Sequence, residues 1–497
     1  MSWLLWEHEQ NGGVLKPTGP ATIESLPDPI LLDIFDIECA GNCFPRRKEW
    51  RPDHENATTL AVLRVCKRWY RISSPLLYRY VNLTVGVDKL DRTLPLFFAI
   101  LSRNPELRTL TNRLDLLADG LTVQASVSEA EAQRLVQLLR WWRPCLQIVH
   151  FHGFIASPNV RAVFFKLAQL PLHELSLSGF FGGISLSFLL KYFQSPHLKT
   201  LCLYRHTWTA DPDEPSAQSL WGPSREQVRR MGDYLLPPDR QFTADVKSLT
   251  ICEPFTDPTE LEYLMRWPRA LDDFSLHAVL RAYSSPRWTP GAVGELLKLH
   301  KDTLRKISLC WMPIRYHPAH GDSIIPDVSS FSTLQHLKLS SGNTLKASPA
   351  EACTCLGARK LERLVIDFDT EDQHEPHMYS CDEGVKAWLV DFAKAWASMN
   401  TDHALKQIFL DLQTDFRVYD PEQEYAWPWY EMKLAKEQLQ KYDLNLVWPT
   451  TGCPSEDEWP VTVEKAKQQA LADREAGTFY GVKMPASSRL VDQPTET

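Results

Sequence analysis

The sequence of 497 residues lacks the features that mark membrane-spanning, secreted and nucleic-acid-binding proteins. No apolar stretch approaches the roughly 18–20 residues that a transmembrane helix needs. The apolar run at 2–6 is followed at once by acidic residues, and so predicts neither a signal peptide nor an anchor. With 54 lysines and arginines against 62 aspartates and glutamates, the net charge is −8, and no long basic run occurs. We therefore expect no membrane and no nucleic acid among the partners.

Disulfide and catalytic patterns are missing as well. The eleven cysteines are odd in number and scattered, which is typical of free thiols in the cytosol or nucleus rather than of a disulfide framework. The chain has no G-x-S-x-G elbow, no H-E-x-x-H and no kinase signature. The glycines of 179–183 lack the Gly-Lys-Ser/Thr ending of a phosphate loop. We expect no catalytic residue, no cofactor and a protein that is not an enzyme.

One group of residues contains potential metal ligands. His374, His377 and Cys381 have plausible donor spacing, and Cys353 and Cys355 lie upstream. Structural zinc sites usually pair Cys-x2–4-Cys or His-x3–5-His elements, and neither pattern is present. The sequence therefore predicts an ordinary loop here and no metal.

What the sequence does contain is a repeat. One pattern recurs nine times: an apolar residue, two variable residues, an apolar residue, one variable residue and a further apolar residue. The copies begin at Leu146, Leu172, Leu198, Val246, Leu271, Leu304, Leu334, Leu361 and Leu405, and a distorted tenth lies at 107–116. Most spacings fall near the roughly 20–29 residues of leucine-rich repeats, with insertions at 204–246 and 366–405.

This spacing predicts a fold. The last two apolar positions of each copy alternate with variable ones, as in a strand with one buried face. Helical spacing follows in several gaps, at 129–142, 160–169, 185–193, 291–300 and 384–399, and Thr289-Pro290 is a good helix start. Such units bury their apolar faces only by stacking. The prediction is an α/β protein whose main part is an irregular leucine-rich-repeat-like solenoid, with parallel strands inside and helices outside.

The N-terminal part has another composition. Residues 23–35 read IESLPDPILLDIF, and Asp28-Pro29 favours a helix start. A second helix is predicted over 58–72, a third short one after Ser74-Pro75, and a strand with Val81, Leu83 and Val85 alternating. So few short helices bury little core, and we expect this part to need a partner.

These residues resemble the F-box of fungal-style F-box proteins, in which the box leads into leucine-rich repeats. The resemblance lies in Leu26-Pro27, in the apolar pairs at 30–31 and 34–35, in the Val-Cys-Lys-Arg-Trp element at 65–69, and in Leu-Leu-Tyr at 76–78 before a strand. The polar insertion at 39–56 is longer than the family usually carries. It could displace the second helix or loop out, and we favour a loop.

The resemblance implies a binding site for the Skp-type adaptor of cullin-RING ubiquitin ligases. The adaptor-binding residues that it implies are Leu26, Pro27, Ile30, Leu31, Ile34, Leu63, Val65, Cys66 and Trp69. The function expected is that of a non-catalytic substrate receptor in the ubiquitin pathway. Three alternatives remain open: a helical cap on the first repeat, an interaction scaffold without ligase function, and an enzyme in an atypical α/β repeat fold.

A solenoid would present its variable strand positions on the concave side, where a target protein could bind. The candidates there are Tyr204, His277, Lys338, Asp367, Phe409 and Asp411. The end of this column is more acidic and would suit a basic peptide.

The predicted organisation has four parts. Residues 1–21 form an N-terminal extension, 22–85 the F-box-like helical domain, 86–445 the solenoid, and 446–497 an extension with one helix and a disordered tail.

Overall fold

The computed structural model of the chain describes residues 23, 26–40, 61–85, 93–118, 127–154, 158–179, 184–186, 189–190, 193, 196–204, 206–207, 236–252, 258–277, 289–309, 324–368, 383–399, 404–412, 429–448, 455–475, 478–479 and 482–483. The chain folds into two compact units. Unit 1 consists of 1–119 and 128–150, and unit 2 of 120–127 and 151–497.

The fold is α/β and contains a 12-stranded sheet. Its strands are β1 (Tyr80–Val85), β2 (Arg113–Ala118), β3 (Ile148–Phe154), β4 (Glu174–Gly179), β6 (Thr200–Tyr204), β8 (Ser248–Cys252), β9 (Asp273–His277), β10 (Lys306–Leu309), β11 (His336–Ser340), β12 (Arg363–Phe368), β13 (Gln407–Leu412) and β14 (Asn445–Val447). They lie in that order. The pairs from β8 to β14 are parallel, as are β1–β2, β4–β6 and β6–β8.

Each of the nine repeat copies supplies one strand, as predicted, because its last two apolar residues point to the same face. Leu175 and Leu177 of β4, Ile307 and Leu309 of β10, and the equivalent pairs of the other copies are at most 2% exposed. The distorted copy at 107–116 leads into β2. β14 was not predicted from the sequence, because its three residues are too few to show an alternation.

The sheet of unit 2 continues through both long insertions. β6 pairs with β8, and β12 pairs with β13 over six residues of register. Two short pairs lie outside the sheet: β5 (Ile184–Ser185) with β7 (His206–Thr207), and β15 (Thr478–Phe479) with β16 (Val482–Lys483).

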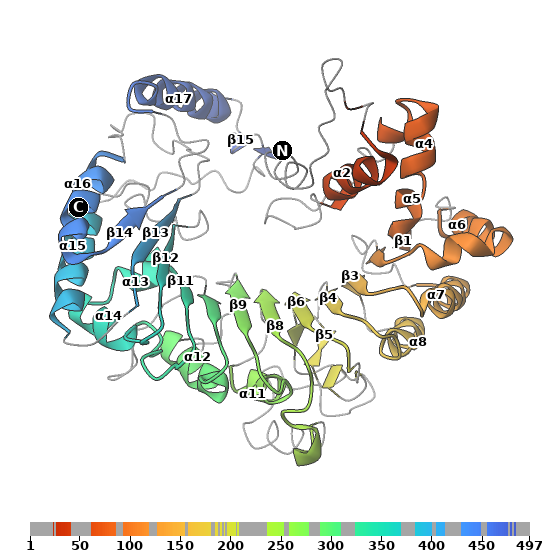
Figure 1. The fold of residues 1–497 in the computed structure, drawn as a ribbon, viewed down its shortest axis with the longest axis horizontal. Coiled ribbons are helices and arrows are strands. Elements are labelled where there is room, and N and C mark those ends of the chain that lie inside the picture. The colour runs from red at the N-terminus through yellow and green to blue at the C-terminus, as the bar shows by residue number, and fades with distance from the viewer. Residues whose placement is uncertain are drawn as a thin grey trace, which may run out of the picture. The chain divides into compact units, whose positions relative to one another are not determined.

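The helices of unit 2 are α8 (Pro158–Leu167), α11 (Pro258–Arg266), α12 (Pro290–Leu297), α13 (Ser341–Thr344), α14 (Pro349–Cys355), α15 (Glu383–Ser398), α16 (Trp429–Leu439) and α17 (Trp459–Glu475). Single turns of 3-10 helix lie at η4 (Pro238–Arg240), η5 (Lys298–His300) and η8 (Gln440–Tyr442). Helices α11 to α16 cover one face of the strands (Figure 1), which is the arrangement predicted from the helical spacing between repeats. Thr289 caps α12 as expected, with its hydroxyl accepting from the amide of Ala292.

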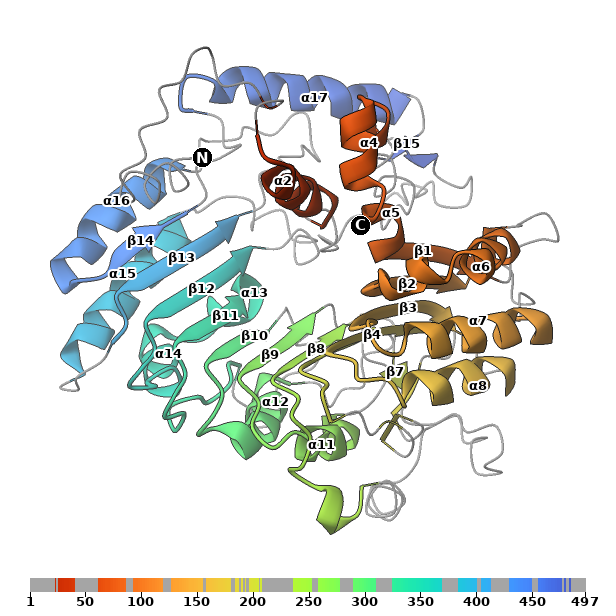
Figure 2. The ribbon, with the colours of Figure 1, turned by 45° about the vertical axis from the view of Figure 1, so that its right-hand side comes forward.

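Unit 1 contains α2 (Asp28–Ala40), α4 (Lys67–Ser73), α5 (Leu76–Arg79), α6 (Thr93–Arg103), η3 (Pro105–Thr109) and α7 (Glu129–Trp142). α7 starts in a capping box, in which the hydroxyl of Ser128 and the carboxylate of Glu131 each bind the other residue's amide. β1 alternates half-buried and buried residues and pairs with β2, so the strand predicted at 81–85 belongs to the large sheet. Figure 2 shows these elements from a second side.

One predicted helix is wrong in its extent. The apolar spacing predicted a continuous helix over 58–72, but a turn at 64–65 and extended backbone at Cys66 separate residues 61–63 from α4. Cys66 acts as the N-cap of α4, and its thiol accepts from the amide of Trp69. The break is a local capping effect that apolar periodicity does not report.

Several predictions fall outside the described residues. These are the extension at 1–21, all of the insertion at 39–56 beyond the end of α2, the His374–Cys381 group, residues 187–188 and 191–192 of the helix predicted at 185–193, and the tail after Lys483.

Candidate functional site

The first candidate site is the surface formed by α2 and α4 in unit 1. Their shared core contains Leu31, Phe35 and Ile72, together with Leu76 of α5, all at most 8% exposed. Phe35 and Trp69 face each other with ring centroids 4.8 Å apart. This small core fixes which side chains of the two helices remain available at the surface.

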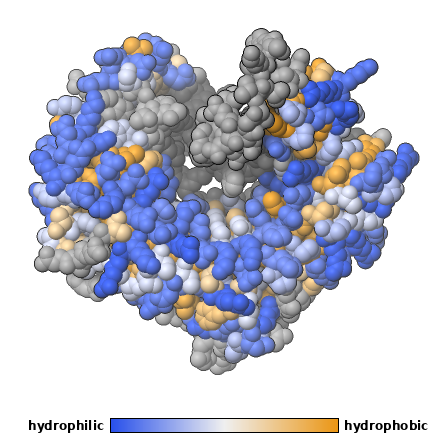
Figure 3. Space-filling view, viewed as in Figure 1, coloured by the Kyte–Doolittle hydropathy of each residue, from blue (hydrophilic) through white to orange (hydrophobic). Residues whose placement is uncertain are grey.

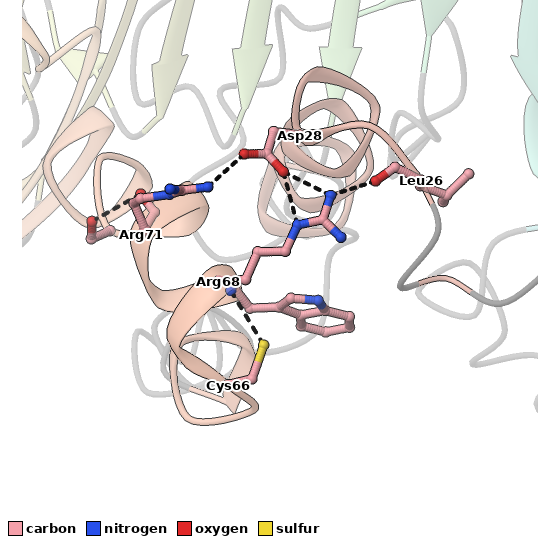
Figure 4. Close-up of polar contacts among 7 residues, drawn as sticks. Leu26, Asp28, Cys66, Arg68 and Arg71 are labelled. Carbon is pink, nitrogen blue, oxygen red and sulfur yellow. Dashed lines mark hydrogen bonds and ion pairs between the residues drawn. The ribbon is translucent and has the colours of Figure 1, made fainter.

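An ionic clamp joins the beginning of α2 to α4 (Figure 4). Arg68 donates from Nε and Nη2 to one carboxylate oxygen of Asp28, at 2.9 and 2.7 Å, and Arg71 donates to the other oxygen at 2.9 Å. Arg68 also donates to the backbone carbonyl of Leu26, at 2.6 Å. The hydrogen bond from Arg68 is the main reason that the pKa of Asp28 lies below its usual value. The clamp thus fixes the Leu26-Pro27 turn against α4.

The implied adaptor-binding residues divide into three groups. Pro27, Val65 and Cys66 are exposed, with Val65 at 59%. Leu26, Ile30, Ile34 and Trp69 are half-buried, and three of these pack on the small core. Leu31 and Leu63 are buried within the chain, at 0% and 9% exposure, and pack underneath the surface.

Sequence reasoning did not assign four residues to this surface. Asp28 was interpreted only as a helix start, and Arg68 and Arg71 were passed over, although opposite charges near two helix ends are a signal for such a clamp. Tyr70, which was not predicted to be an adaptor contact, is 59% exposed. It stands one residue beyond Trp69, on the side of α4 that the core does not use.

The second candidate site lies in unit 2, on the sheet face opposite the helices. Lys338 of β11 reaches Asp367 of β12 at 2.9 Å and Asp411 of β13 at 2.6 Å. Partial burial would lower the pKa of Lys338, but the two carboxylates outweigh it and raise that pKa. The structure thereby weakens the basic-peptide hypothesis, because the two acidic side chains already share a cation.

Three more residues were predicted on this face: Phe409, Tyr204 and His277. Phe409, next to the cluster on β13, has the Arg363 guanidinium 4.6 Å from its ring centroid. Tyr204 and His277 lie in one row with Cys252 between them, on β6, β8 and β9. Strand spacing puts Tyr204 and His277 about 10 Å apart, and β10 separates the strand of His277 from the strand of Lys338.

No group of three or more histidines, cysteines, aspartates or glutamates in the described ranges could hold a metal ion. Burial raises the pKa of the Cys202 thiol to about 11 and that of Cys353 to about 12. Protonated thiols at neutral pH are poor nucleophiles.

Within the described ranges, every helix is too short or too polar to cross a membrane. In comparisons with known proteins, no family model matches the chain and no curated protein matches it.

Proposed function

We propose that this chain is a non-catalytic substrate receptor of a Skp-cullin-F-box ubiquitin ligase. In this proposal α2, α4 and α5 act as the F-box and bind the adaptor, and the repeat sheet holds the target protein. Ubiquitin transfer is carried out by other subunits, to which this chain contributes proximity and orientation.

The observation that carries the proposal is the α2–α4 surface. A short turn, Leu26-Pro27, is fixed by the Asp28–Arg68 clamp. The exposed apolar side chains of Pro27, Val65 and Tyr70 lie beside the small core that α2 and α4 share. Exposed apolar side chains on neighbouring elements are typical of a protein interface. Parallel strands with variable residues on their open face supply a second surface for a target.

Co-purification tests the proposal. The chain would be co-expressed with a Skp-type adaptor and its cullin, and recovered through an affinity tag. We expect both proteins to be recovered, and expect neither with the Pro27→Ala, Val65→Glu variant, in which a charge enters the apolar surface.

Two other outcomes would redirect the account. Recovery of the adaptor without the cullin would favour the interaction scaffold over the ligase subunit. Failure of the native chain to bind the adaptor would contradict the proposal and leave a helical cap on the first repeat.

A further inference from the structure

Helix α6, which follows β1 in unit 1, presents an apolar face to the outside. Leu96 and Ile100 lie one helical turn apart and are 60% and 41% exposed, whereas Leu94 and Leu101 on the inner face are at most 2% exposed. The helix reads TLPLFFAILSR, with no charged residue before Arg103. A helix covered on one side normally carries polar residues on the other. Figure 3 shows hydrophobic surface over α6.

Helix α6 packs next to α5, which directly follows α4 in the chain. The ring of Tyr78 on α5 stacks on that of Phe97 on α6, with centroids 6.4 Å apart. Figures 1 and 2 both show α4, α5 and α6 following one another along one side of unit 1. Four of the eleven exposed large apolar residues found in the described ranges, Val65, Tyr70, Leu96 and Ile100, therefore lie on this short run of elements.

The size of the α2–α4 surface also calls for an extension. A stable interface buries about 800 Å² on each partner. A large aromatic side chain supplies about 150–250 Å² when fully buried, so Pro27, Val65 and Tyr70 together fall well short. The half-buried side chains of Leu26, Ile30, Ile34 and Trp69 add only the part of their surface that is still exposed. Leu96 and Ile100 add further exposed apolar surface.

Along α4, α5 and α6 the charges have one sign, whereas α2 carries Asp28 and the exposed Asp33. In the described stretches 61–85 and 93–103 no acidic residue occurs; the basic residues are Arg64, Lys67, Arg68, Arg71, Arg79 and Arg103. Arg64, Lys67 and Arg103 are exposed, in a chain whose net charge is −8. A partner surface that matches this one has an apolar centre and acidic residues around it.

We propose that the adaptor contact extends from α4 across α5 onto α6, and that the adaptor presents there an apolar surface bordered by acidic residues. This inference rests on the proposed function and assigns Leu96 and Ile100 to the interface. Lys67 and Arg103 border it.

Calorimetry with a purified Skp-type adaptor tests the extension. We expect the Leu96→Ser, Ile100→Ser variant of the full chain to bind about tenfold more weakly than the native chain, because two apolar contacts are lost. The matched control is Leu299→Ser, Leu471→Ser, which changes two residues of 38% and 45% exposure in unit 2 and leaves the affinity unchanged. Equal melting temperatures of the two variants show that folding is not the cause.

The outcomes separate this inference from the proposed function. Native affinity in the α6 variant, together with lost binding in the Pro27→Ala, Val65→Glu variant, overturns the inference and leaves the box intact. Absence of binding by the native chain overturns both. Affinity should also fall several-fold as NaCl is raised from about 50 to about 500 mM, and an unchanged affinity would contradict the acidic border.

Discussion

Replacing Lys338 by methionine is expected to destabilise the C-terminal end of the sheet. Lys338 bridges Asp367 and Asp411, and its side chain is 30% exposed, against 15% and 39% for the two carboxylates. Methionine keeps the length of the side chain but removes the cation, so that two aspartates of adjacent strands face each other without a shared partner. The destabilisation therefore combines a lost ion pair with a new repulsion.

The magnitude follows from the burial of the three groups. Exposed ion pairs contribute about 0–1 kcal/mol, and breaking a buried pair costs about 3–5 kcal/mol. A half-buried triad falls between these limits, at about 2 kcal/mol, which corresponds to an increase of about 30-fold in the population of the locally opened state. The increase should be confined to β11, β12 and β13.

Amide hydrogen exchange measures this effect strand by strand, without requiring two-state unfolding of a chain with two units. We expect exchange in β11 to β13 to accelerate in Lys338→Met and to return most of the way in the triple variant that also carries Asp367→Asn and Asp411→Asn. Native exchange rates in Lys338→Met, or a triple variant less stable than the single one, would refute the reasoning.

Three further predictions concern the clamp, the core and a helix cap. The pKa of Asp28 is lowered from 3.8 in the folded chain, so the stabilisation by its ionised carboxylate is present above 3.8 and is lost as the pH falls through the folded pKa. Adaptor binding or the melting temperature, measured against pH, should show this loss in the native chain but not in Asp28→Asn. Leu337→Ala removes a fully buried side chain from β11 and should cost about 2–5 kcal/mol, measured by denaturant unfolding, with surface Leu299→Ala close to neutral. Thr289→Ala should cost about 1 kcal/mol by removing the N-cap of α12, visible as faster amide exchange in that helix; unchanged exchange would show that the cap does not contribute.

The strands of the large sheet were predictable because each buries two apolar residues at a spacing of two. Ile307, Leu337 and Leu364, for example, come from three separate copies and lie side by side in register, all fully buried. The apolar pattern is easy to recognise in the sequence because the core of such a sheet accepts only apolar residues at these positions. β14 was missed because three residues carry too little of the pattern.

The side-chain contacts of both candidate sites were less predictable. The clamp of Asp28 with Arg68 joins residues 40 positions apart, and the contact of Lys338 with Asp411 joins residues 73 apart. Neither separation is marked by a periodicity, since the partners meet only after helices or strands have packed. Cys66 shows a related limit, because its capping hydrogen bond interrupts an otherwise regular apolar spacing.

The central claim is that the α2–α4 surface binds a Skp-type adaptor. It is tested most directly by titrating the purified adaptor into the native chain and into two variants, Val65→Glu on this surface and Val461→Glu on α17. The two valines are nearly equally exposed, at 59% and 56%, so the variants differ in location and not in the change made. We predict binding by the native chain and by Val461→Glu, and none by Val65→Glu. Equal binding by both variants, or no binding by the native chain, would contradict the account.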